Sequence, residues 1–132
     1  MNCLDTTVVI DYLEGEPYVG EFLESNDNIP LFVPIPALHE TFIGAVRVRG
    51  DEGLERVRSD LDWLEPIALT IDGVAEAAKI DAELHRSGEP IGPLETLIAG
   101  VVREAGGTVV TCDDHFERVD GLDVNRIGSD GP

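Results

Sequence analysis

Short apolar runs along this chain alternate with longer amphipathic stretches, and the first of these runs is the most informative. Cys3 and Leu4 form a brief apolar segment that ends at Asp5. The residues from Thr6 onwards predict a helix with an apolar inner side, capped by Asp5, Thr6 or Thr7. A strand that begins at residue 2 and leads directly into a helix is typical of an interior strand in a parallel sheet. Ligands bind such sheets at the carboxyl ends of the strands, so Asp5 is expected where a site would lie.

The same alternation continues to the end of the chain. Further apolar runs predict strands at 29–35, 66–69, 108–112 and 122–127. Amphipathic stretches predict helices at 18–23, 36–50, 51–64, 70–86 and 93–105, with a short helical turn at 116–119. Alternating strands and helices predict an α/β fold with three layers, in which a central, mostly parallel sheet has helices on both faces. We expect one domain over residues 1–127 and a flexible tail over residues 128–132.

Charge is the unusual feature of the composition. A chain of 132 residues with 42% hydrophobic residues is expected to form one ordinary globular domain. It carries 27 acidic residues against 9 basic ones, a formal net charge of −18, and Lys79 is its only lysine. So acidic a surface repels itself at low ionic strength, and salt relieves that repulsion. The charge indicates either a salt-rich cytoplasm or a basic partner, and the charge count alone does not separate the two.

The cysteines and the hydropathy pattern narrow the class of protein. Cys3 and Cys112 both fall in apolar runs, so we interpret them as buried free thiols. No spacing of cysteines and histidines suggests a zinc site. Acidic residues interrupt the N-terminal region, which argues against a signal peptide, and no apolar run is long enough to span a bilayer. We therefore expect a cytoplasmic protein.

Four acidic residues are placed where they can meet. Asp5 follows the first predicted strand, Glu40 lies on the helix after the second, Glu95 is in the first turn of the helix that begins at Pro93, and Asp113 follows the strand at 108–112. Each alone is explained as a helix cap or as a partner of a helix dipole. Together, with no lysine or arginine beside them, they favour a bound cation. Oxygen ligands select Mg²⁺ or Mn²⁺, and such ions commonly serve phosphate chemistry.

Several segments of the chain resemble those of a known family. The segments LDTTVVIDYL, PALHETFIG and IGPLETLIAGVVREAGGTVVTCDDHF, and the ending FERVDGLDV, are similar to those of PIN domains. The resemblance is strongest to the VapC-type toxins of toxin–antitoxin pairs, and it covers nearly the whole chain. It implies a Rossmann-like sheet and a metal-dependent ribonuclease that hydrolyses RNA with metal-activated water. It also implies a small antitoxin partner that blocks the site, and a homodimer.

The resemblance assigns roles to particular positions. Matched position by position, the catalytic and metal-binding tetrad is Asp5, Glu40, Glu95 and Asp113. The residues expected to support this site are Thr6, Thr111 and Asp114. The chain departs from the family pattern at one position, where Glu95 stands in place of the usual aspartate. The extra methylene moves the carboxylate by ~1 Å, a shift large enough to change activity.

Two arginines are candidates for contact with substrate, and two other functions fit the same sequence. Arg47 lies on the same helix face as Glu40, so Arg47 and Arg49 are the candidate RNA-binding residues. Arg56 and Arg58 are expected to pair with neighbouring acids on a solvent face. His115 is expected to be a surface turn residue, with substrate contact as the alternative. A PIN domain that binds RNA or an antitoxin without cutting, and a metal-dependent phosphatase on the same scaffold, stay open as alternatives.

Overall fold

The computed structural model describes residues 1–128 of the chain. Its strands are β1 (Asn2–Leu4), β2 (Leu31–Pro34), β3 (Glu65–Ile67), β4 (Thr108–Thr111) and β5 (Asp123–Arg126). Its helices are α1 (Thr6–Leu13), α2 (Pro17–Ser25), α3 (Ile35–Asp60), α4 (Ile71–Arg86) and α5 (Pro93–Ala105), with a short 3₁₀ helix, η1 (His115–Arg118). The predicted elements are all present, with bounds that differ by a few residues. Apart from Gly128, the predicted flexible tail lies outside the described residues.

The five strands form one sheet in the order β3-β2-β1-β4-β5, and every pair of neighbours is parallel. β1 therefore lies at the centre, as its early position in the chain predicts. The chain runs outward from β1 to β2 and β3, then crosses back to place β4 on the other side of β1. The strand order thus reverses between β1 and β4, where open parallel sheets bind their ligands.

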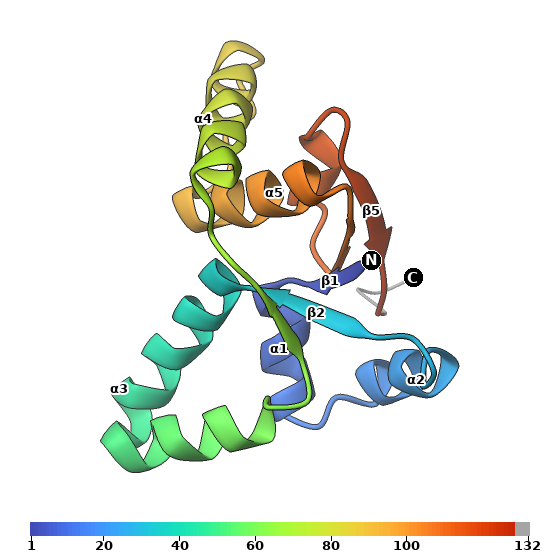
Figure 1. Cartoon of the computed structure of the whole chain (residues 1–132), viewed down its shortest axis with the longest axis vertical. Coiled ribbons are helices and arrows are strands. Elements are labelled where there is room, and N and C mark those ends of the chain that lie inside the picture. The colour runs from blue at the N-terminus through green and yellow to red at the C-terminus, as the bar shows by residue number, and fades with distance from the viewer. Residues whose placement is uncertain (129–132) are drawn as a thin grey trace.

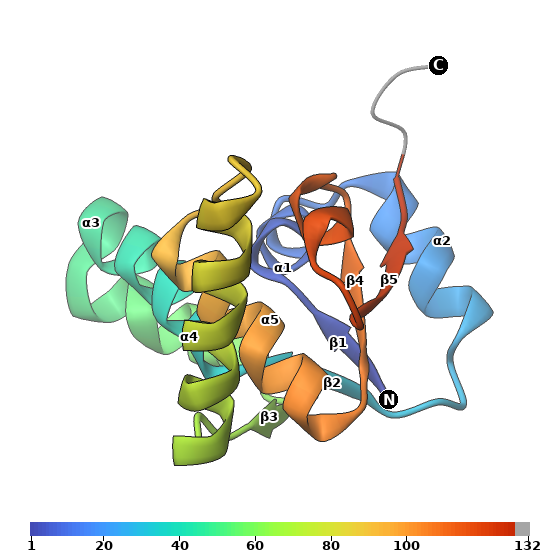
Figure 2. The same ribbon diagram turned by 90° about the horizontal axis from the view of Figure 1, so that it is seen from above.

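Helices cover both faces of the sheet, which confirms the predicted three-layer α/β architecture. Figure 1 shows α5, with α4 packed against it, on one face and α1 on the other, and Figure 2 shows the same layers from above. The contact of α4 with α5 is close because α5 carries a glycine at the crossing. A Cβ on Gly100 would lie 2.5 Å from the backbone nitrogen of Ala77.

The core lies between these layers and leaves the carboxyl edge of the sheet to polar residues. Its fully buried side chains come mainly from the central strands and from α1 and α5, and they include Leu4, Val8, Val9, Ile98, Val102, Val109, Val110 and Phe116. Burying a side chain of this size contributes roughly 1.5–3 kcal/mol. β1 and β4 are therefore fixed against each other, and the residues that follow them are held at one place.

The long helix α3 bends at its middle. Arg49 and Gly50 have non-helical backbone angles, and Gly50 has a φ of 59°, a conformation that favours glycine. The sequence predicts two helices that meet at Gly50, and the bend agrees with that division. Figure 1 shows the two segments of α3 making a sharp corner at the edge of the molecule.

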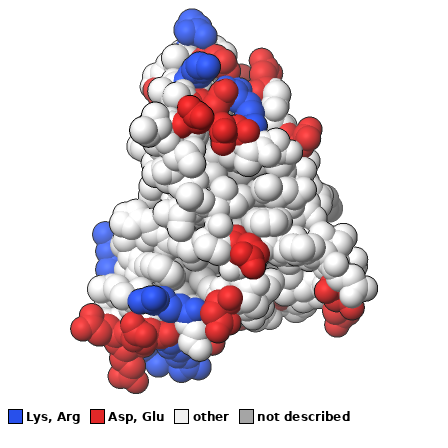
Figure 3. Space-filling view, in the orientation of Figure 1, with Lys and Arg blue, Asp and Glu red and all other residues white. Residues whose placement is uncertain are grey.

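Charge is unevenly distributed over the surface. In Figure 3, acidic and basic side chains gather over α4 and over the bend of α3, while the centre of the same face is mostly uncharged. Arg58 lies 3.7 Å from Glu55 near the end of α3, which confirms the pairing expected for it. Within residues 1–128, no helix is both long enough and apolar enough to cross a bilayer.

Candidate active site

Asp5 is fixed by three hydrogen bonds directly after the central strand. It is the N-cap of α1, where its Oδ1 accepts the Val8 N–H at 3.1 Å and the Thr7 hydroxyl at 2.7 Å. Its Oδ2 accepts the Thr111 hydroxyl at 2.6 Å, from the end of β4. Its exposure is only 2%. Asp5 is thus a helix cap, as predicted, and also a buried carboxylate at the point where the strand order reverses.

The environment of Asp5 disfavours its charge. Burial raises the pKa of the Asp5 carboxyl to about 6, although the hydrogen bonds from Thr111, Thr7 and Val8 act in the opposite direction. The negative charge of Asp113 raises the pKa further. A cation held near both carboxylates would remove this penalty, because it favours the ionised form of each.

Asp113 is connected to Asp5 through Thr111. The Asp113 N–H donates to Thr111 Oγ1 at 3.0 Å, while the hydroxyl of the same threonine donates to Asp5. Asp113 Oδ1 in turn accepts the backbone N–H of His115 at 2.7 Å, which orients the carboxylate at the start of η1. Thr111 therefore sets the spacing of the two acids by hydrogen bonding to both. Cys112, predicted to lie in the buried strand, comes after its end and is only partly buried.

Glu95 reaches the same edge from the first turn of α5. Its Oε1 accepts the Gly92 N–H at 3.1 Å, so Glu95 caps the start of α5, which has Pro93 at its first helical position. Its Oε2 lies 2.7 Å from Nδ1 of His115. This hydrogen bond is the largest cause of a raised pKa for the His115 imidazole, and the charges of Glu95 and Asp113 add to it.

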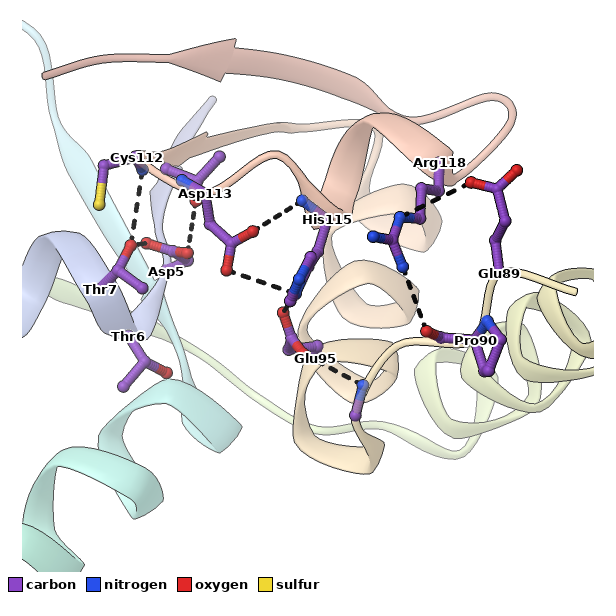
Figure 4. A network of polar contacts seen from close by, with 12 residues as sticks. Asp5, Thr6, Thr7, Glu89, Pro90, Glu95, Cys112, Asp113, His115 and Arg118 are labelled. Carbon is purple, nitrogen blue, oxygen red and sulfur yellow. Dashed lines mark hydrogen bonds and ion pairs between the residues drawn. The ribbon is translucent and has the colours of Figure 1, made fainter. Parts of the chain in front are cut away.

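Glu40 is linked to the edge of the sheet through Thr6. The hydroxyl of Thr6, the residue next to Asp5, donates to Glu40 Oε1 at 2.6 Å. Figure 4 shows Thr6 beside the first turns of α3, with Asp113, His115 and Glu95 on the far side of Asp5. All four predicted acids are thus linked to this edge by hydrogen bonds. Asp5 and Glu40 nevertheless lie outside the tightest group of donor atoms in the described chain.

That tightest group contains His115, for which the sequence predicts a different role. Glu95, Asp113 and His115 each offer one ligand atom, and these atoms all lie within 4.8 Å of one another. His115 was predicted to be a surface turn residue, but it is half-buried and bonded to Glu95 across 20 positions of sequence. The available signal was its position two residues after Asp113, which allows its N–H to close a turn on that carboxylate.

The remaining predicted residues lie at the surface. Arg47 and Arg49 are exposed on α3 near its bend, and Asp114 is exposed at the start of η1. Arg49 also lines a cavity of about 330 Å³ between the two segments of α3, together with Val48, Gly53 and other residues. The side chains of Arg47, Arg49 and Asp114 do not belong to the hydrogen-bonded group around Asp5 and Asp113. Their roles in substrate binding or support stay predictions.

The sequence and the fold of this chain are similar to those of known proteins. The family model "PIN domain" matches residues 3–122. A protein of Shigella flexneri named "tRNA(fMet)-specific endonuclease VapC" is 30% identical over 122 residues, covering 90% of this chain and 92% of that protein. DNA-bound VapBC from Salmonella typhimurium superposes with a TM-score of 0.83 at 26% identity, covering 95% of this chain and 96% of that chain.

A second solved structure has a similar fold at lower sequence identity. VapBC2 from Rickettsia felis, bound to a DNA fragment from its promoter, superposes with a TM-score of 0.86 at 19% identity. That match covers 96% of this chain and 98% of the other. At 19% identity this superposition demonstrates a common fold only. Family membership rests on the family model and on the Shigella flexneri relative, which both match most of the sequence. This chain belongs to the PIN domain family.

Proposed function

We propose that this protein is a ribonuclease of a toxin–antitoxin pair, which hydrolyses RNA phosphodiester bonds with Mg²⁺ or Mn²⁺. The observation that carries the proposal is the continuous hydrogen-bonded series Asp5–Thr111–Asp113–His115–Glu95 at the carboxyl edge of the sheet. The relative from Shigella flexneri, named as a tRNA endonuclease, supports the same class of reaction. In this proposal the catalytic and metal-binding acids are Asp5, Glu40, Glu95 and Asp113.

The donor set fits a divalent cation. The four proposed acids have no lysine or arginine bonded to them within the described residues, and the pKa of Asp5 is raised by burial and by Asp113. Oxygen ligands of this kind match Mg²⁺ and Mn²⁺. When bound, such an ion supplies an activated water and stabilises charge on the phosphate oxygens.

The protein's own residues contribute position and protonation state. Thr111 and the first turn of α1 hold the Asp5 carboxylate in one orientation, and the Gly92 N–H does the same for Glu95. This preorganisation lowers the cost of assembling the site around substrate. The exposed Arg47 and Arg49 on α3 are the groups that we propose to hold RNA phosphates, because arginine binds phosphate oxygens in a bidentate way.

The proposed assembly includes an antitoxin and a second copy of the chain. The similar structures from Salmonella typhimurium and Rickettsia felis are VapBC complexes bound to DNA. By this likeness, a small antitoxin would bind this chain and block its acidic edge. The homodimer follows from the family resemblance, and sedimentation of the purified chain with and without its antitoxin would test it.

Cleavage of single-stranded RNA tests the proposed reaction. The wild type should cut RNA with Mn²⁺ or Mg²⁺ and stop when a chelator is added. Asp113→Asn should lower the cleavage rate at least about 100-fold, because it removes a ligand whose outer-shell partners alone are worth 10–100-fold. Asp123→Asn, an exposed change on β5, is the matched control and should leave the rate unchanged.

The outcomes separate the rival functions. Equal cleavage by the wild type and Asp113→Asn would rule out this site as the source of activity. RNA or antitoxin binding without cleavage in the wild type would favour the binding module. Hydrolysis of a small phosphate monoester, with no cutting of RNA, would favour the phosphatase.

A further inference from the structure

His115 lies between two of the proposed metal-binding acids. Its Nδ1 is 2.7 Å from Glu95 Oε2 and 3.4 Å from Asp113 Oδ2. Figure 4 shows the imidazole ring directed into the space that these two carboxylates share. The sequence suggests a site built from oxygen ligands alone, whereas the structure adds a ring nitrogen at its edge.

These separations are those of ligands around one ion. Metal–ligand distances for divalent ions with oxygen and nitrogen donors are about 2.0–2.2 Å, so neighbouring ligands at right angles lie roughly 3 Å apart. The Nδ1 atom lies at about that distance from an oxygen of each carboxylate. The three donor atoms all lie within 4.8 Å of one another, so side-chain adjustment would bring them around one ion.

The local backbone holds the three groups independently of an ion. The His115 N–H donates to Asp113, and the next residue, Phe116, is buried at 1% exposure and anchors η1 in the core. Glu95 is fixed from the opposite side by the Gly92 N–H. Glu95 is thus oriented by a contact outside the trio, and Asp113 by the backbone of His115, as supporting hydrogen bonds position the ligands of a metal site.

The trio is also open on one side. The side chains of His115, Glu95 and Asp113 are 39%, 26% and 23% exposed, respectively. A metal site that acts on a substrate needs such open positions for water and for an oxygen of the substrate. A closed structural site would bury all of its ligands.

We propose that His115 is a nitrogen ligand of the metal site, beside Glu95 and Asp113, and that it biases the site towards Mn²⁺ over Mg²⁺. Imidazole nitrogen suits transition-metal ions, whereas Mg²⁺ prefers oxygen ligands and keeps several waters. The inference rests on the metal site of the proposed function, but not on RNA cleavage. A carboxylate–imidazole pair that never binds an ion explains the same distances and is the rival that the test must exclude.

Electron spin-echo spectroscopy of Mn²⁺ bound to the full chain, without RNA, detects a nitrogen atom that is directly bound to the ion. The wild type should show the modulation of a directly bound ¹⁴N, and selective ¹⁵N-histidine labelling should change it. His115→Gln should abolish the modulation and weaken Mn²⁺ binding about tenfold, while Mg²⁺ binding should change by less than about threefold. His85→Gln is the matched control, because His85 is exposed on α4 and bonded to Asp81.

The possible results separate a failure of the proposed His115 ligand from a failure of the proposed ribonuclease activity. Bound Mn²⁺ without nitrogen modulation in the wild type would overturn the inference and leave His115 as an ion-pair partner only. Nitrogen modulation that persists in both His115→Gln and His115→Asn would also overturn it. Nitrogen modulation in a wild type that does not cut RNA would support the inference while contradicting the ribonuclease. Circular dichroism of each variant checks that the fold is retained.

Discussion

Two halves of the acidic edge differ in burial and in how far their polar atoms are hydrogen-bonded to the rest of the protein. In the inner half, Asp5 is 2% exposed, and both of its oxygens accept hydrogen bonds from the protein. In the outer half, Glu95, Asp113 and His115 are partly exposed and bonded mainly to one another. The inner half is therefore part of the core as well as of the site, whereas the outer half is free to exchange its contacts for an ion. Substitutions should reveal this difference through stability in the inner half and through metal affinity in the outer half.

The largest effect is expected from the charge of Asp5. Its folded pKa, about 6, lies above the ordinary value of 3.8. The folded state thus holds the proton more tightly, and this contribution to stability is full below about pH 4 and lost as pH rises through 6. In the metal-free protein, Asp5→Asn should remove this loss, which amounts to about 3 kcal/mol. Asparagine is also a good N-cap, so α1 keeps its start.

Denaturant unfolding of the metal-free protein from pH 4.5 to 8 measures this effect. The stability of the wild type should fall relative to that of Asp5→Asn across this range, and saturating Mn²⁺ should reverse the order at pH 8. Asp123→Asn, at an exposed position, should follow the wild type at every pH. Parallel pH curves for the wild type and Asp5→Asn would mean that Asp5 is ionised at little cost.

A smaller effect is expected at Thr111, which connects the two halves. Thr111→Val removes the donor to Asp5 Oδ2 and the acceptor of the Asp113 N–H. An unsatisfied buried polar group costs about 1–3 kcal/mol. Metal affinity should fall 10–100-fold, as it does when outer-shell partners are lost. Thr108→Val, at the other end of β4, is the control.

Calorimetric titration with Mn²⁺ and thermal unfolding together measure the Thr111 effect. A loss of stability without a change in affinity would show that Thr111 supports only the core. Unchanged values for both quantities would contradict the connection of the two halves that the hydrogen bonds indicate.

The smallest effect is expected at Glu95, in the outer half. Its length allows one oxygen to cap α5 and the other to contact His115. The shorter side chain of Glu95→Asp cannot keep both contacts, so Mn²⁺ affinity should fall a few-fold and the cap should lose ~0.5–1 kcal/mol. Cleavage rates at several Mn²⁺ concentrations for the wild type, Glu95→Asp and Glu95→Ala measure it, with Glu104→Asp on the exposed end of α5 as the control.

This last comparison also distinguishes a working enzyme from a weakened one. A higher rate and tighter Mn²⁺ binding in Glu95→Asp would mean that the site is better suited to aspartate. Equal behaviour of the wild type, Glu95→Asp and Glu95→Ala would reduce Glu95 to a helix cap and remove it from the site.

Features that depend on neighbours along the chain could be predicted from the sequence alone. A cap for α1 within residues 5–7, the break of α3 at Gly50 and the start of α5 at Pro93 each follow from a few adjacent residues, and all three are present, with Asp5 as the cap. The alternation of strands and helices determined the parallel sheet, and with it the edge at which the acids meet. The salt-rich cytoplasm inferred from the net charge stays a prediction.

The side-chain contacts at that edge, in contrast, could not be predicted before the packing of the elements was known. Thr111 bonds to Asp5 across 106 positions of sequence, and His115 bonds to Glu95 across 20. Such contacts depend on how α5 and η1 pack against β1 and β4, and no local pattern encodes a separation between elements. His115 was therefore assigned to the surface, because its neighbours indicate a turn, while its partner Glu95 is supplied by a different helix.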